Sequence, residues 1–236
     1  WLRVFEDATG KDLSQFALWY SQAGTPRVTV EEAFDAGVYR LTLRQATRAT
    51  PGQDQKQPQV IPVAYGFLAQ DGSEIETGVL ELTEASQTFV FEVAEEPILS
   101  LFREFSAPVI VERSISNAER AFLMEHDTDP FNKWEAARSL SLEVALTLLA
   151  GPDAETPAEW LNALVAMAAD EGLDPEFLAM MPAVPGQDEI AAPELIAHAR
   201  TRLADYKAPR HIVFVDSVGR APNGKADYAG TRKRER

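Results

Sequence analysis

Few residues of this chain have the type and spacing that catalysis or metal binding requires. There is no cysteine, which excludes a thiolate metal site and a cysteine nucleophile. The histidines are His126, His198 and His211, and no two stand four residues apart, the spacing at which a helix offers two imidazoles to one zinc ion. We therefore expect no metal site. We interpret His126 as a helix-end residue and the other two histidines as structural or exposed.

Two pairs of adjacent carboxylates are the remaining candidates for proton transfer or calcium binding. They are Glu95-Glu96 and Asp170-Glu171. Adjacent side chains on a helix do not face the same way, and a calcium site needs more oxygen ligands than either pair supplies. We interpret both pairs as solvated surface.

The composition is that of a globular protein. Apolar residues make up 45% and charged residues 25% of the 236 residues, which is ordinary for a soluble domain. No apolar run is long enough to span a membrane, and the N-terminus lacks the pattern of a signal peptide. We therefore expect a cytoplasmic protein without a membrane partner. The start at Trp1 suggests a fragment.

The net charge of −15 is unevenly distributed. From residue 198 to the end, ten Lys or Arg and four Asp or Glu give +6, so the preceding residues carry −21. An acidic body of this size argues against non-specific binding of nucleic acid. The basic end fits a nucleic-acid-binding arm as the alternative. It contains apolar runs typical of folded structure, however, so we expect no nucleic-acid partner.

Residues 12–30 combine a helix with the start of a sheet. Apolar side chains recur at steps of three and four residues from Leu13 to Tyr20. Asp12 is placed to cap this helix, and Gly24 is placed to end it. The alternation of a half-buried strand follows immediately. The change of period predicts a domain boundary.

Residues 27–113 show the alternation expected of strands. It is clearest at Tyr39, Leu41, Leu43, Ile61, Val63, Tyr65 and Phe67. Asp71-Gly72 is a hairpin turn signal, and residues 46–58 form a long polar connection. About seven short strands at this spacing predict a two-layer sandwich.

After the strands, the apolar period changes to that of helices. Asp129-Pro130 marks the start of a helix that runs towards Leu149, and further helices begin at Pro157 and at Asp174-Pro175. The face that we expect the second of these helices to bury consists of Trp160, Leu161, Leu164, Val165 and Ala168.

Several motifs occur in a fixed order over residues 1–190. They are Phe16-x-x-Trp19-Tyr20-Ser21-Gln22-Ala23-Gly24-Thr25-Pro26, Gln57-Pro58 with Ile61-Pro62, Gln87-Thr88-Phe89-Val90-Phe91 and Glu104-Phe105-Ser106-Ala107-Pro108-Val109. This order resembles the aminopeptidase N (alanyl aminopeptidase) family of zinc metallopeptidases. The resemblance implies the last helices of a catalytic domain in residues 1–25 and an immunoglobulin-like β-sandwich in 26–115. It also implies a partial armadillo- or HEAT-like helical domain in 116–190.

The same resemblance implies what the chain lacks. The family holds zinc with H-E-x-x-H and a downstream Glu, and it recognises the amine of a peptide with a G-A-M-E-N-type loop. Neither motif occurs among the 236 residues. The resemblance therefore implies a non-catalytic C-terminal portion that is inactive alone, holds no cofactor and packs against a catalytic domain. Peptides and zinc belong to the full-length family.

Residues 191–236 carry different motifs. Glu194-Leu195-Ile196-Ala197-His198-Ala199-Arg200, Leu203-Ala204-Asp205-Tyr206-Lys207-Ala208-Pro209-Arg210 and Pro222-Asn223-Gly224-Lys225 occur in this order. They resemble the C-terminal end of acyl-CoA synthetases of the adenylate-forming superfamily, which implies that Lys225 approaches an acyl phosphate or adenylate. No Ser/Thr/Gly-rich phosphate loop precedes them, so we do not expect Lys225 alone to form an adenylate. The change near Ile190 fits a gene fusion, a frameshift or an assembly join.

The sequence thus predicts a multidomain β + α protein. An immunoglobulin-like β-sandwich is followed by the start of an α-helical repeat domain and by a small α/β C-terminal remnant. Three functions remain open at this point. The first is the non-catalytic portion of an aminopeptidase N-like metallopeptidase. The second is a partner-binding module without enzymatic activity, and the third is an acyl-CoA ligase remnant that carries Lys225.

Overall fold

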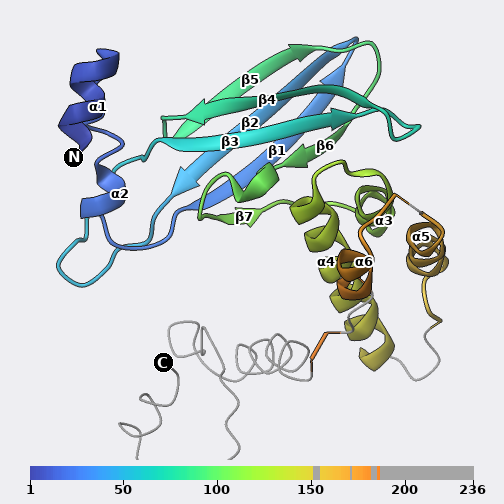
Figure 1. The fold of residues 1–236 in the computed structure, drawn as a ribbon. Coiled ribbons are helices and arrows are strands. Elements are labelled where there is room, and N and C mark those ends of the chain that lie inside the picture. Colours follow the sequence, from blue (N-terminus) through green and yellow to red (C-terminus); the bar gives the residue numbers. More distant parts are fainter. Residues whose placement is uncertain (151–154, 171, 182–184, 187–236) are drawn as a thin grey trace, which may run out of the picture. The chain divides into compact units, whose positions relative to one another are not determined.

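The computed structural model describes residues 1–150, 155–170, 172–181 and 185–186 (Figure 1). Residues 1–144 and 155–183 belong to one compact unit, which holds every described strand. Sequence features outside the described residues include Glu171, His198, His211 and Lys225. No helix of the described part is long and apolar enough to cross a membrane.

Two sheets form the sandwich that the alternating pattern predicts. The first contains β1 (Arg27–Asp35), β2 (Val38–Ala46), β5 (Ser86–Glu92) and β7 (Ile110–Glu112), in the order β5-β2-β1-β7. The second contains β3 (Ile61–Leu68), β4 (Glu74–Leu82) and β6 (Ile98–Leu101), in the order β4-β3-β6. All pairs are antiparallel except β1 with β7.

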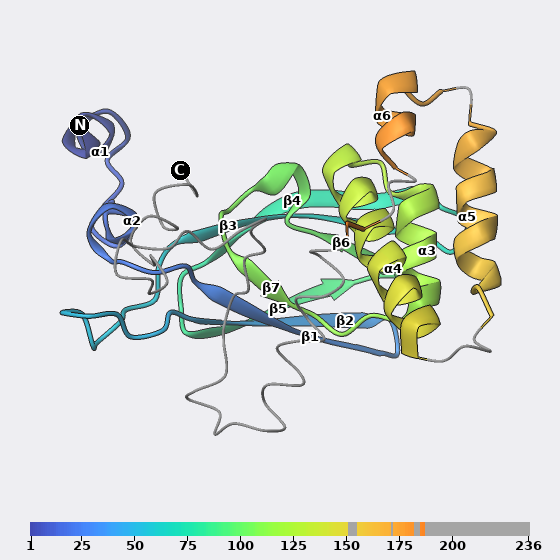
Figure 2. The ribbon, with the colours of Figure 1, turned by 90° about the horizontal axis from the view of Figure 1, so that it is seen from below.

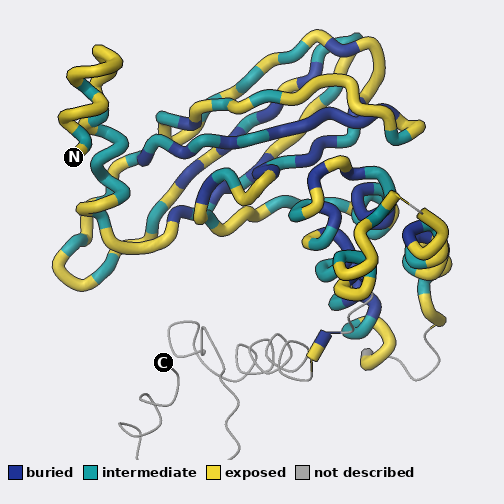
Figure 3. Tube along the Cα trace, in the orientation of Figure 1, coloured by how far each residue is buried: buried dark blue, intermediate teal, exposed yellow. Residues whose placement is uncertain are grey.

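The core of the sandwich lies where the alternation places it. The inward residues of β2, Tyr39, Leu41 and Leu43, are buried, and so are the alternate residues of β3 from Ile61 to Phe67. Figure 3 shows buried positions alternating with partly buried or exposed ones along β2. Gly72 has a φ of +84° in the turn between β3 and β4, as the Asp71-Gly72 signal predicts.

The N-terminal helices differ from the prediction. Helix α1 (Leu2–Thr9) ends at Gly10, but α2 covers only Leu18–Ser21 instead of the predicted run from Leu13. Asp12 does not cap a helix, because its Oδ1 accepts a hydrogen bond from Ser14 N at 2.8 Å and closes an Asx turn. Two side chains then anchor the segment to the sandwich. Gln15 Nε2 donates to Thr83 O at 2.6 Å, and Trp19 Nε1 donates to Val60 O at 2.7 Å.

The helical part begins directly after β7. It contains α3 (Asn117–His126), α4 (Pro130–Ala150), α5 (Ala158–Ala168) and α6 (Pro175–Met180). The predicted caps are confirmed, because Asp129 Oδ1 accepts from Asn132 N at 2.8 Å and Asp174 Oδ1 accepts from Glu176 N at 2.9 Å. Figures 1 and 2 show α3, α4 and α5 grouped together.

The predicted buried face of α5 is wrong in part. Ala163 and Met167 are buried and Trp160 and Leu164 are partly buried, whereas Leu161, Val165 and Ala168 are exposed. Trp160 Nε1 donates to Ser141 Oγ of α4 at 3.1 Å, which fixes the rotation of α5 about its axis. The small side chain of Ala163 allows close contact between helices. The prediction from hydrophobicity alone therefore gave a partly wrong buried face for α5.

Candidate functional site: the junction of sandwich and helices

Of the candidate site residues found in the sequence, the structure describes His126, Glu95, Glu96 and Asp170. His126 ends α3 as predicted, with its ring 4.6 Å from that of Phe122. Glu95 and Glu96 are exposed, which agrees with a solvated surface. In the described residues, no group of three or more His, Asp or Glu side chains could hold a metal ion.

The polar centre of the described structure is Arg103, which sequence reasoning missed. It lies in the short 3-10 helix η1 (Arg103–Phe105) after β6, and its side chain is 9% exposed. Its Nη1 donates to Glu74 Oε2 of β4 at 2.7 Å, and its Nε donates to Ser100 Oγ at 2.9 Å. Its Nη2 donates at 3.1 Å both to Asp127 Oδ1 and to Thr128 Oγ1. Arg103 therefore joins β4 and β6 to the connection between α3 and α4.

The two carboxylates that face Arg103 have opposite pKa shifts. Burial raises the pKa of Asp127, and the nearby Ser100 hydroxyl, the Asp129 N–H and Arg103 only partly oppose this shift. Hydrogen bonds from Arg103 and Thr128 lower the pKa of Glu74, because they favour its ionised form. Glu74 thus supplies the stable negative charge beside Arg103. Asp127 is buried, and burial makes its ionised form less favourable than in water.

The backbone around Arg103 is built to admit its guanidinium. A Cβ added at Gly66 of β3 would lie 2.1 Å from Arg103 Cζ, so any larger residue would displace the side chain. Phe102, Glu104 and Phe105 have φ values of 60°, 56° and 53°, a region that costs a non-glycine residue about 1–3 kcal/mol. Glu104 N donates to Asp129 Oδ2 at 3.1 Å, which helps to hold this strained segment.

A second buried arginine, Arg113, joins the sandwich to α3. Its Nε and Nη2 donate to the two carboxylate oxygens of Glu32 at 2.5 and 2.9 Å, and Nη2 also donates to Glu119 Oε1 at 2.7 Å. Burial alone would lower the pKa of Arg113, but Glu32 and Glu119 outweigh it and raise this pKa. Tyr39 OH also donates to Glu32. Burial, assisted by Glu32, raises the pKa of Tyr39.

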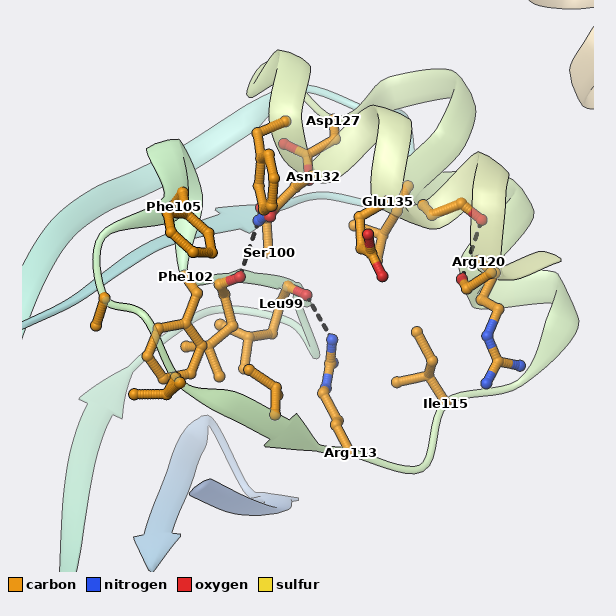
Figure 4. A pocket seen from close by; sticks show the side chains of 18 of the residues that line it. Leu99, Ser100, Phe102, Phe105, Arg113, Ile115, Arg120, Asp127, Asn132 and Glu135 are labelled. Atoms are coloured by element: carbon orange, nitrogen blue, oxygen red, sulfur yellow. Dashed lines mark hydrogen bonds between the residues drawn. The ribbon is translucent and has the colours of Figure 1, made fainter. Parts of the chain in front are cut away.

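A pocket with a volume of about 490 Å³ lies beside Arg113, at the junction of the sandwich with α3 and α4 (Figure 4). Elements β6, η1 and β7 form one side of it, and α3 and α4 form the other. Asn132 stabilises the inner wall, since its Nδ2 donates to Ser100 Oγ and to Leu101 O, both at 2.9 Å. The main apolar side chains of the lining are Leu99, Phe102, Phe105, Ile115, Leu123 and Phe131.

We expect Arg103→Met to destabilise the chain by about 3–5 kcal/mol, because it leaves the carboxylate of Asp127 buried without a counter-charge. The control is Arg44→Met, since Arg44 pairs with Glu31 where both side chains are about half exposed. That change should cost less than about 1 kcal/mol. Urea unfolding at pH 7 measures both values. Equal losses in the two variants would contradict the role of Arg103.

Glu74→Gln should lower the free energy of unfolding by about 1 kcal/mol at pH 7, a value reduced for the partial exposure of Glu74. Because the folded-state pKa of Glu74 is lowered from 4.5, its contribution is complete above 4.5 and disappears as the pH falls through the folded-state pKa. The wild-type and Glu74→Gln stabilities should therefore converge in acid.

Urea unfolding of both proteins at pH 7 and at about pH 3 measures this convergence. Glu81→Gln is the control, because Glu81 is an exposed residue of the same strand, β4. That control should match the wild type at both pH values. A difference between wild type and Glu74→Gln that persists unchanged in acid would refute the assignment.

Comparison with known proteins assigns both parts of the fold. Residues 24–114 match a family described as a domain of unknown function (DUF3458) with an Ig-like fold. Residues 117–208 match the family DUF3458_C, which is described as ARM repeats. These descriptions agree with the predicted sandwich and helical-repeat architecture. The second match also extends past the change near Ile190.

The relatives are aminopeptidases over most of the chain. Aminopeptidase N of Escherichia coli is 38% identical over 205 residues, which cover 80% of this chain and 24% of the relative. A crystal structure of Legionella pneumophila aminopeptidase A in complex with aspartic acid is 27% identical. It has a TM-score of 0.69 and covers 80% of this chain and 22% of that one.

A separate match concerns the end of the chain. A medium-chain acyl-CoA ligase of Mycobacterium avium is 52% identical over 44 residues, 19% of this chain and 8% of the relative. It supports the resemblance of the last residues to acyl-CoA synthetases. The chain spans about a quarter of the length of its aminopeptidase N relative. The chain thus matches the C-terminal, non-catalytic region of aminopeptidase N, with its Ig-like and helical domains.

Proposed function

We propose that this chain acts as the non-catalytic portion of a zinc-dependent aminopeptidase that removes N-terminal residues from peptides in the cytoplasm. The observation that carries the proposal is the 38% identity to aminopeptidase N over 80% of the chain. The residues of this chain do not fit zinc, because H-E-x-x-H is absent from the sequence and the described part has no cluster of metal ligands. No step of hydrolysis is therefore assigned to them.

The N-terminal helices supply a surface for such a catalytic domain. Trp1, Phe5 and Tyr20 are 81%, 45% and 68% exposed. With Leu13 and Phe16 they line an apolar groove of about 370 Å³. Exposed aromatic side chains that gather in a groove are typical of an interaction surface. We assign this groove to contact with the catalytic domain.

Gln15 and Trp19 anchor the segment that carries the groove to the sandwich. Both side chains donate to backbone carbonyls of the sandwich loops. A catalytic domain bound at α1 and α2 would therefore be held at a fixed orientation to β3 and β4. In this proposal the chain contributes positioning, and the catalytic domain contributes the chemistry.

The proposal predicts that the chain binds the catalytic portion of Escherichia coli aminopeptidase N, produced as a separate polypeptide. Adding the chain should raise the hydrolysis of alanine p-nitroanilide, whereas the chain alone should show no turnover. The double variant Phe5→Ser/Tyr20→Ser should weaken binding about tenfold or more, as expected for the loss of aromatic anchors.

Val90→Ser is the matched control, because Val90 is 59% exposed on β5, away from the groove residues. It should bind as the wild type does. Calorimetry gives the affinities, and the p-nitroaniline release gives the activity. Turnover by the chain alone, or equal binding by both variants, would refute the proposal.

The acyl-CoA ligase match makes Lys225 a second candidate for chemistry, although Lys225 lies outside the described residues. We expect the chain to form no acyl-adenylate from ATP and a fatty acid, because the sequence has no phosphate loop to hold the nucleotide. Release of pyrophosphate measures the reaction. Release that disappears in Lys225→Ala would establish a ligase function instead.

A further inference from the structure

Strand β7 has a free edge beside the junction pocket. It is the last strand of the first sheet and pairs with β1. Ile110 N donates to Pro26 O at 2.9 Å, on the β1 side. Because successive residues of a strand direct their backbone groups to opposite sides, the N–H and C=O of Val111 point away from β1. In the residues that the structure describes, no hydrogen bond from outside the ladder reaches either group.

The neighbouring edge of the second sheet is partly closed by side chains. This edge belongs to β6, the last strand of that sheet. Leu99 O accepts from Arg113 Nη1 and Leu101 O accepts from Asn132 Nδ2, both at 2.9 Å. Figure 4 shows the bond between Arg113 and Leu99. Two carbonyl groups of β6 are therefore occupied, whereas Val111 keeps both its N–H and its C=O available.

The apolar interior of the sandwich is uncovered beside the β7 edge. Val111 pairs with Val28, whose side chain is fully buried, so both side chains lie on the inner face of the sheet. Val111 is nevertheless 41% exposed, and Phe105, which lines the same pocket, is 57% exposed. A further strand beside β7 would place alternate side chains on this inner face and cover the apolar surface that is now exposed.

The outer edges of β4 and β5 lack this combination. They are the end strands on the other side of each sheet. Val90 of β5 is 59% exposed. Among the described residues that line the junction pocket, however, none belongs to β4 or β5. A strand added at either of these edges would form backbone hydrogen bonds without a pocket for its side chains.

An extended peptide fits both features of the β7 edge. Its backbone presents a donor and an acceptor with the partial charges complementary to those of Val111. A helix does not, because its backbone groups bond within the helix. The pocket of about 490 Å³ can take the apolar side chains that alternate on one face of such a peptide.

We propose that the β7 edge binds an extended segment of a partner polypeptide by strand addition. The N–H of Val111 donates to a carbonyl of the segment, and the C=O of Val111 accepts from one of its N–H groups. Apolar side chains at alternate positions of the segment enter the junction pocket. This site is independent of the proposed peptidase function, because it uses neither the groove of α1 and α2 nor a catalytic domain.

Three peptides of equal length and charge test the mode of binding by calorimetry on the full chain. The first is acetyl-Lys-Thr-Val-Thr-Val-Thr-Lys-amide. The second is the same peptide with every backbone nitrogen methylated, and the third has serine in place of valine. We expect the first to bind in the millimolar range or tighter and the other two to bind about tenfold more weakly. Equal affinities for the three, or no binding of the first, would refute the proposal.

Val111→Pro removes the backbone donor, and an edge strand tolerates proline where its N–H faces solvent. Val90→Pro is the matched control on the other edge of the sheet. Val93 N donates to Gly37 O on the β2 side, so the alternation along β5 turns the N–H of Val90 away from β2. Val111→Pro should weaken the first peptide about fivefold, and Val90→Pro should leave its affinity unchanged. Equal effects of the two changes would contradict the site.

Hydrogen exchange on the unmodified chain gives a readout that needs no variant. The amide of Val111 should exchange rapidly in the chain alone and about tenfold more slowly when about nine-tenths of the chain holds the first peptide. Slow exchange without peptide would show that another part of the chain covers this edge. Exchange that slows with rising chain concentration would show that a second copy covers it. Either result would overturn the proposal.

Discussion

The charge of Arg103 is the constraint on which the described structure depends. A guanidinium remains protonated at any physiological pH, and this one is almost fully buried. The protein must therefore supply its hydrogen-bond acceptors, which lie on β4, on β6 and in the connection between α3 and α4. Apolar contact favours association without fixing direction, whereas the planar fork of an arginine accepts few arrangements. Arg103 therefore constrains the orientation of the first helices on the sandwich, together with Arg113.

The strained segment after β6 belongs to the same constraint. Left-handed backbone at Phe102, Glu104 and Phe105 would relax if nothing held it. The hydrogen bonds of Arg103 and the contact from Glu104 N to Asp129 Oδ2 hold it in place. Asp129 also caps α4 through its other oxygen. One aspartate thus couples the start of a helix to the shape of the turn that carries the arginine.

The sequence predicts the regular elements better than the junction. Alternation at residues such as Leu41 and Val63, and the cap at Asp129, are local signals, and the structure confirms them. The length of α2 and the face of α5 depend on contacts with distant segments, so local period could not give them. Arg103 follows Leu101-Phe102 and precedes Glu104-Phe105, and a charged side chain in such a segment is ordinarily expected at the surface. A hint of its burial comes from a distant position, Gly66, a glycine inside the apolar strand β3 that leaves space for the guanidinium.

The two arginines also explain why a pocket can persist between the sandwich and the helices. Each arginine fixes one edge of the junction through charged hydrogen bonds, so the side chains between them need not close the gap to hold the parts together. A junction stabilised only by apolar contact would gain free energy by collapsing over such a space. Here the edges are fixed by groups that accept only specific partners. Charged hydrogen bonds at the rim can therefore hold the sandwich and the helices together while the space between them stays open.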